Sequence, residues 1–166
     1  MSAVALRLAT PDDLDLIQRW DEAPHVRETG GDPEFNDWDW AGQLGRVVPW
    51  REFLIAEVSG RPIGFLQIID PAEEESRYWG DCGPNLRAID IWIGEADALG
   101  QGYGTQMMQA AIARCFADPA VAAILIDPMA SNTAAHRFYE RLGFRFVERR
   151  FFGPDDCFVF RLDRGP

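Results

Sequence analysis

Hydrophobic positions along the chain follow two periods, of two residues and of about 3.6 residues, which predict strands and helices respectively. The predicted strands are Val4–Ala9, Arg51–Val58, Pro62–Ile69, Leu86–Ile93, Val121–Asp127, Phe144–Phe152 and Cys157–Leu162. The predicted helices are Thr10–Trp20, Gly102–Ala117 and one that begins at Ser131 or Asn132. About seven strands interspersed with helices indicate an α+β, or mixed α/β, fold.

The most informative stretch joins the strand that ends at Ile93 to the helix that begins at Gly102. Glycine stands at every second position of the loop, at Gly100, Gly102 and Gly104. A chain without Cβ atoms can turn sharply and lets a ligand approach the backbone closely. The first N–H groups of a helix have no intrahelical partner, and the helix dipole is positive at that end. The loop therefore predicts an anion site, for which an ordinary tight turn is the alternative.

Two common nucleotide motifs are excluded by the spacing of these glycines. The dinucleotide fingerprint requires Gly-x-Gly-x-x-Gly, whereas this loop has Gly-x-Gly-x-Gly. The phosphate-binding loop of nucleoside triphosphatases requires Gly-Lys-Ser or Gly-Lys-Thr, which does not follow. The anion is therefore expected to belong to a different class of ligand.

Length and charge narrow the possible partners. A chain of 166 residues has the size of one domain, and we expect residues 1–166 to form it. The formal net charge of −11 repels nucleic acid and anionic membrane and attracts a cationic small molecule, although acidity also serves solubility alone. Three separated cysteines and no apparent signal peptide favour a reduced, cytoplasmic protein, and no metal-ligand spacing is present.

The glycine loop, Gly-Gln-Gly-Tyr-Gly-Thr, resembles the pyrophosphate loop of the GNAT acyltransferases, which bind acetyl-CoA. A second GNAT motif is similar to the segment from Ser131 to Phe144, with Asn132 at the start of a helix and Phe138-Tyr139 near its end. The resemblance extends from about Leu6 to the C-terminus. It implies a GNAT fold, in which a mixed, mostly antiparallel sheet is splayed between its fourth and fifth strands and flanked by helices.

By this resemblance the acetyl-CoA site can be assigned residue by residue. The pantetheine arm is expected along the backbone of Ile91, Trp92 and Ile93, and Asn132 is expected to bond its amides. The pyrophosphate is expected on the backbone amides of Gln101, Gly102, Tyr103, Gly104 and Thr105. Leu99 stands where the family usually has Gln or Arg. This departure leaves the backbone donors in place, because a phosphate needs donors rather than a particular side chain.

Amide formation needs an uncharged amine and a proton for the leaving thiolate. Asp90, in the motif strand, is the predicted base, and a lone carboxylate in an apolar strand is costly without a functional need. Asp127 is predicted to meet the acceptor amine across the gap, or to form only a turn before Pro128.

In the family, Tyr139 lies near the coenzyme sulfur and can donate a proton. The alternative is that Tyr139 is only a core residue. We expect Asp90 and Tyr139 on one side of the sheet, and His136 at the surface.

Within the superfamily the sequence is similar to the aminoglycoside 6'-N-acetyltransferases. The similarity includes Tyr78-Trp79-Gly80, Arg87 to Asp90, Leu99 to Thr105, Asp127-Pro128 and Ser131-Asn132. It implies acetyl transfer to the 6'-amine of an aminoglycoside in a ternary complex, by a monomer or homodimer. The alternatives are acyl transfer to a siderophore or another small amine or hydroxylamine, and acyl-CoA binding without catalysis.

Acceptor recognition is expected in the two weakly patterned segments of the chain. The acidic, aromatic loop after Asp70 carries Trp79 and Asp81, which are predicted to contact a polycation, although a run of acids is also typical of a solvated loop. In the GNAT arrangement the segment Asp21–Trp50 covers the acceptor site. Its tryptophans serve this role, or they only pad the sheet.

Overall fold

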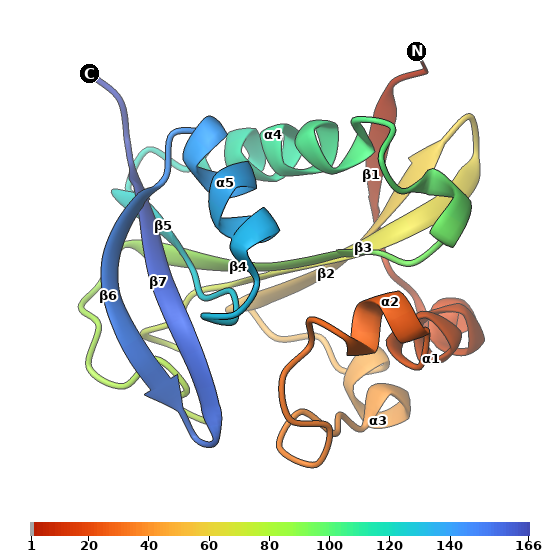
Figure 1. Cartoon of the computed structure of the whole chain (residues 1–166), viewed down its shortest axis with the longest axis horizontal. Helices are drawn as coiled ribbons and strands as arrows, with labels where there is room; N and C mark the ends of the chain where they lie inside the picture. Colours follow the sequence, from red (N-terminus) through yellow and green to blue (C-terminus); the bar gives the residue numbers. More distant parts are fainter. Residues whose placement is uncertain (1) are drawn as a thin grey trace.

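The computed structural model describes residues 2–166, which form one seven-stranded mixed sheet with helices on both faces (Figure 1). The strand order is β1-β2-β3-β4-β5-β7-β6, and β4 and β5 form its parallel pair. The strands are β1 (Val4–Leu8), β2 (Arg51–Val58), β3 (Arg61–Ile69), β4 (Leu86–Ile93), β5 (Ala123–Ile126), β6 (Arg145–Phe152) and β7 (Asp155–Asp163). The α-helices are α1 (Leu14–Asp21), α2 (Pro24–Arg27), α3 (Trp40–Leu44), α4 (Tyr103–Phe116) and α5 (Thr133–Arg141). The predicted fold class is confirmed.

The helix predicted from Thr10 begins as a 3₁₀ turn, Pro11–Asp13, before α1. The Asp13 carboxylate accepts the Thr10 N–H at 2.8 Å and two N–H groups of Arg7 at 2.9 and 2.8 Å. Pairing with Arg7 lowers the pKa of Asp13. This half-buried ion pair connects β1 to the turn that follows it.

Three hydrophobic clusters pack against the sheet, and two of them lie between the sheet and the helices. Met107, Met108 and Tyr139 belong to the cluster beneath α4 and α5. The cluster facing α1 to α3 is aromatic, and Trp40 packs against Phe65 with ring centroids 5.3 Å apart. Trp40 therefore pads the sheet, and it also lines the cavity described below, as Trp38 and Trp50 do. Within residues 2–166, no helix is long and apolar enough to cross a membrane.

The sheet splits between β4 and β5, as predicted. Their parallel pairing joins Leu86–Ala88 to Ala123–Leu125, after which β4 continues to Ile93 while β5 ends at Ile126. Figure 1 shows β5 and β7 diverging from β4 below α5. The later half of β4 therefore presents one backbone edge without a neighbouring strand.

His136 was expected at the surface, and this expectation is wrong. Its side chain is buried, its ring stacks on Phe158 with centroids 4.6 Å apart, and its Nε2 lies 2.9 Å from the Met129 carbonyl oxygen. His136 precedes Tyr139 by one helical turn on α5, so both residues face the sheet.

A buried carboxylate ties the loop between α2 and α3 to the hairpin of β6 and β7. Asp155, 6% exposed, accepts the Asp32 N–H at 2.8 Å and the Asn36 side-chain N–H at 2.9 Å. A Cβ on Gly31, whose φ is +80°, would lie 2.4 Å from the Asp155 carboxylate. The glycine therefore permits the close approach that connects the two sides of the split.

We expect Asp155→Ala to lower the free energy of unfolding by about 2 kcal/mol, because hydrogen bonds to a charged acceptor are lost and the Asp32 N–H is left unpaired. Urea unfolding followed by tryptophan fluorescence measures this change. The matched control is Asp156→Ala, which removes only a surface ion pair with Arg149 and should have a much smaller effect. Equal effects of the two substitutions would contradict the assigned role of Asp155.

Candidate active site

A cavity of about 610 Å³ opens at the split between β4 and β5. The segment containing α1 to α3 forms one wall, and the loop between β3 and β4 forms another. The ends of β4 and β5, one side of α5, and residues of β2, β3 and β7 complete it. Among its lining residues are Asp90, Asp127, Trp79, Asn132 and Tyr139, five of the residues predicted from the sequence. The structure thus brings together residues that are widely separated along the chain.

Asp90 points from β4 into this cavity, where its carboxylate is accessible to solvent but surrounded by the cavity walls. Gln67 on β3 faces Asp90 across the strand pair and donates a side-chain N–H to it at 2.7 Å. Burial raises the pKa of Asp90, and the hydrogen bond from Gln67 opposes that shift. A carboxylate shifted toward neutral pH is better suited to accept a proton from an ammonium ion.

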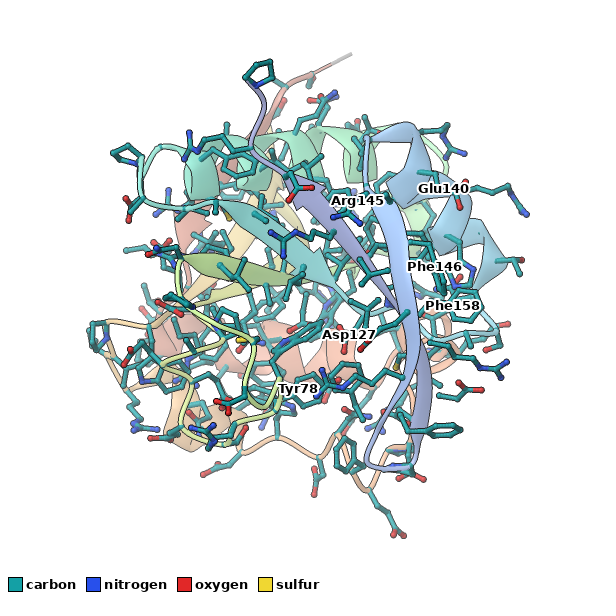
Figure 2. All side chains as sticks on the ribbon, turned by 90° about the vertical axis from the view of Figure 1, so that its left-hand side faces the viewer. Tyr78, Asp127, Glu140, Arg145, Phe146 and Phe158 are labelled. Carbon is teal, nitrogen blue, oxygen red and sulfur yellow. The ribbon has the colours of Figure 1, made fainter. Side chains whose placement is uncertain are left out.

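Asp127, just beyond the end of β5, is the second carboxylate of the cavity. Its Oδ2 accepts a short hydrogen bond of 2.5 Å from the hydroxyl of Tyr78, and Figure 2 shows this pair near the end of β5. Burial raises the pKa of Asp127 well above its usual range, and the nearby charge of Asp90 raises it further. Two such carboxylates stabilise a positive charge placed between them, because that charge offsets their mutual repulsion.

Tyr139 reaches the same cavity from α5. Burial, and then the charges of Asp90 and Asp127, raise the pKa of its phenol, which therefore remains protonated. A neutral phenol in this position can donate a proton or a hydrogen bond.

The expectation that Asp90 and Tyr139 lie on one side of the sheet is wrong. The cross-strand partners of Asp90 belong to the face covered by α1 to α3, whereas Tyr139 packs in the cluster on the α4 and α5 face. Because the sheet is open at this point, the two side chains still line one cavity. Asp90 and Tyr139 need not lie on the same face of the sheet to act together, because the split in the sheet connects its two faces.

The two residues predicted from the acidic, aromatic loop lie in different environments. Trp79 is 4% exposed, packs edge-on against Phe152 with centroids 5.0 Å apart, and contributes to the cavity wall. Asp81 is exposed, forms an ion pair with Arg77 at 3.2 Å, and is not among the lining residues. The structure therefore brings Trp79, but not Asp81, to the cavity.

The open edge of β4 carries the residues predicted to hold an extended ligand. The Gly94 N–H bonds the Ile63 carbonyl of β3, so the alternation of a strand directs the backbone groups of Ile91 and Ile93 to the opposite, open edge. The Ile93 carbonyl already lies 2.8 Å from Nε2 of His25. Trp92, between them, directs its backbone toward β3 and stacks on Phe65 at 4.7 Å. The free edge therefore comes from both backbone groups of Ile91 and the N–H group of Ile93, rather than from all three residues.

The glycine loop has the conformation expected of an anion site. Gly102 caps α4 with φ of +82°, and Gly100 has φ of +70°. Gly104 lies in the first turn of α4, where a Cβ would meet Ile93 and Phe138 only at an ordinary 3.7 Å. Its lack of a side chain is therefore not required by protein packing, which fits close approach of a ligand to the amides of Gln101 to Thr105.

Sequence reasoning assigned no role to three polar residues that line the cavity, namely Gln67, Asp155 and Arg51. Gln67 is a polar residue in an otherwise apolar strand, which is the same signal that identified Asp90. The partners of Tyr78 and Asp155 lie 49 and 123 residues away in sequence, so no local pattern reveals them. Among residues 2–166 no group of three potential metal ligands is found.

Comparison with known proteins agrees with this geometry. Residues 9–152 match the acetyltransferase (GNAT) domain family. The aminoglycoside N(6')-acetyltransferase type 1 of Klebsiella pneumoniae is 34% identical over 148 residues, which are 86% of this chain and 74% of that protein. The lysine N-acyltransferase MbtK of Mycolicibacterium paratuberculosis is 28% identical, covering 86% of this chain and 66% of that protein.

A solved structure of AAC(6')-Ib in complex with ribostamycin and coenzyme A superposes with a TM-score of 0.88 at 30% identity, covering 98% of this chain and 94% of that chain. This superposition covers the split sheet and the cavity, whereas the family match ends at residue 152, before β7. The chain therefore belongs to the GNAT acetyltransferase family and, within it, is similar to the aminoglycoside 6'-N-acetyltransferases.

Proposed function

We propose that this protein transfers the acetyl group of acetyl-CoA to a primary amine of an aminoglycoside, the 6'-amine, in a ternary complex. The observation that carries the proposal is the pair of carboxylates, Asp90 and Asp127, in a cavity at the split of the sheet. This site suits a cation that must lose a proton before it reacts. The AAC(6')-Ib structure with ribostamycin and coenzyme A supports the same pairing of ligands.

In this proposal the acetyl-CoA site lies along the free edge of β4 and at the start of α4. Acetyl-CoA supplies a thioester whose acyl carbon is open to attack. The backbone groups of Ile91 and Ile93 bind the extended arm, and the Asn132 side chain provides polar contacts from the start of α5. The amides of Gln101 to Thr105 bind the diphosphate through their N–H groups and the positive end of the helix dipole.

The acceptor amine arrives as an ammonium ion, since an alkyl amine is almost fully protonated at neutral pH. Asp127 holds the ammonium, and the phenol of Tyr78 fixes the orientation of that carboxylate. Asp90 accepts the proton, directly or through water, which releases the lone pair for attack. The nitrogen attacks the acyl carbon and loses a second proton as the C–S bond breaks. Tyr139, whose raised pKa keeps its phenol neutral, donates its proton to the leaving sulfur and regains that second proton, directly or through water.

The direct test is release of free thiol from acetyl-CoA in the presence of ribostamycin, kanamycin, polyamines and amino acids. We expect turnover with the aminoglycosides, and fragmentation of the product by mass spectrometry should place the acetyl group on the 6'-amine. Binding of acetyl-CoA without turnover of any amine would overturn the proposal.

Asp90→Asn should lower kcat by about 10²- to 10⁴-fold, because the amide cannot accept a proton. The affinity for acetyl-CoA, measured by calorimetric titration, should stay unchanged. Asp12→Asn, an exposed change in the first turn after β1, is the charge-matched control. If Asp90→Asn keeps kcat near the level of that control, then another group accepts the proton.

The acidic limb of the pH dependence of kcat/KM reports the ionisation of the interacting carboxylates Asp90 and Asp127. The base must be ionised, so activity falls as the pH drops through its pKa, which burial raises. Gln67→Leu removes the hydrogen bond that stabilises the ionised form, and the acidic limb should therefore move to higher pH. The alkaline part of the profile, which is governed by the acceptor amine, should not move. An acidic limb that stays in place or moves to lower pH would contradict the assignment of Asp90 as base.

Gly104→Ala separates diphosphate binding from folding. The added Cβ makes only ordinary contacts at 3.7 Å and alanine favours a helix, so thermal stability should be equal or higher. The same methyl group occupies space beside the predicted diphosphate, and we expect the KM for acetyl-CoA to rise about tenfold. Gly45→Ala, where no atom lies within 4 Å of the added Cβ, is the control. An unchanged KM would place the diphosphate elsewhere.

A further inference from the structure

Arg51, the first residue of β2, is a cation in the wall of a cavity otherwise suited to cations. It lines the cavity and is only partly exposed. Among residues 2–166 it takes part in no ion pair, and its Nη2 is buried without a hydrogen-bond partner. A buried guanidinium nitrogen without a partner is costly, and the partly exposed remainder of the side chain lines the cavity, where an anion can bind it.

The aromatic surroundings of Arg51 hold its guanidinium in place without satisfying its donors. The guanidinium carbon lies 4.3 Å from the Phe53 ring centroid and 4.9 Å from that of Trp50. Such contacts engage the π system of a guanidinium, whereas its N–H groups lie in the plane and remain available for a carboxylate. Burial, and then the charge of Arg46, lower the pKa of Arg51.

The acidic residues nearest to Arg51 do not neutralise it directly. Glu75 forms a bidentate ion pair with Arg46, and Glu74 accepts hydrogen bonds from Ser76 and from the Tyr78 N–H. Glu74 and Glu75 are therefore engaged with other donors. A ligand can provide the partner that the protein does not.

The register of the sheet places Arg51 relative to the proposed reaction site. Cross-strand partners share a face, and Phe53 pairs with Gln67, which pairs with Asp90. Arg51 lies two residues before Phe53 and hence on the same face as Asp90, two strands away. Strand spacing and rise put their Cα atoms roughly 12 Å apart. A short aliphatic chain, hydrogen-bonded at both ends, spans a gap of this order between the two side chains.

We infer that Arg51 forms a carboxylate-binding subsite at the far end of the acceptor cavity, so that the enzyme also acetylates amines carrying a carboxylate a few carbons away. The inference rests on the proposed function, because the amine end of such an acceptor occupies the site at Asp90 and Asp127. It adds a second acceptor class to the polycations and assigns specificity to Arg51. No bond other than the amide bond of the proposed reaction is made.

Three acceptors of equal length test the effect of the charge at the end of the molecule that does not react. In 6-aminohexanoate, hexylamine and 1,6-diaminohexane the reacting amine is the same, and the other end is negative, neutral or positive. With the native enzyme, kcat/KM should be highest for 6-aminohexanoate and lowest for 1,6-diaminohexane. In Arg51→Gln the value for 6-aminohexanoate should fall at least tenfold, while that for 1,6-diaminohexane stays equal or rises. Arg51→Lys should keep most of the native order.

Arg145→Gln makes the same change of charge on β6, outside the cavity lining, and should leave the native order intact. Calorimetric titration of the three compounds gives the same comparison without catalysis. A native enzyme that fails to favour 6-aminohexanoate in both assays overturns the subsite, as does an Arg51→Gln effect shared by all three compounds. Absence of turnover with every amine, together with preferential binding of 6-aminohexanoate, counts against the proposed transfer and leaves the subsite supported.

Discussion

The structure depends on the short parallel pairing of β4 and β5. Three residue pairs hold these strands together, and beyond Ala88 they separate. Had the pairing continued, the backbone of Ile91 and Ile93 would be consumed by the sheet, and Asp90 would lie against Asp127 without space for a substrate. The separation leaves a strand edge for one ligand and a cavity for another, and it gives both access to the same point.

An opening in the middle of a sheet must be stabilised by contacts around it. Above the sheet, α4 and α5 share one apolar cluster that includes residues from strands on both sides of the split. Below it, Asp155 connects the hairpin of β6 and β7 to the loop between α2 and α3 by hydrogen bonds of 2.8 and 2.9 Å. Tyr78 bridges to Asp127 at the rim. These contacts hold the two halves of the sheet around the cavity.

Local features of this site could be predicted from the sequence, and long-range ones could not. The glycine loop and the helix after it are neighbours in the chain, and Asp90 is conspicuous as a carboxylate in an apolar strand. The burial of His136, and the face of the sheet on which Tyr139 lies, depend on how α5 packs against a split sheet. Helical spacing alone does not determine that packing. Asp81 pairs with Arg77 instead of lining the cavity. This depends on the path of the loop between β3 and β4, whose sequence has no clear hydrophobic period.

The same reasoning explains why acceptor specificity was the least predictable property. The charge of −11 favours a cation only on average, whereas binding depends on which charges are already paired within the cavity. Asp155 and Glu75 are engaged by protein donors, whereas Asp90 and Asp127 line one cavity. Within residues 2–166, Arg51 forms no ion pair, and its Nη2 lacks a hydrogen-bond partner. The charge that an acceptor meets therefore depends on which of these groups remain unpaired, and pairing is a property of the folded chain rather than of its composition.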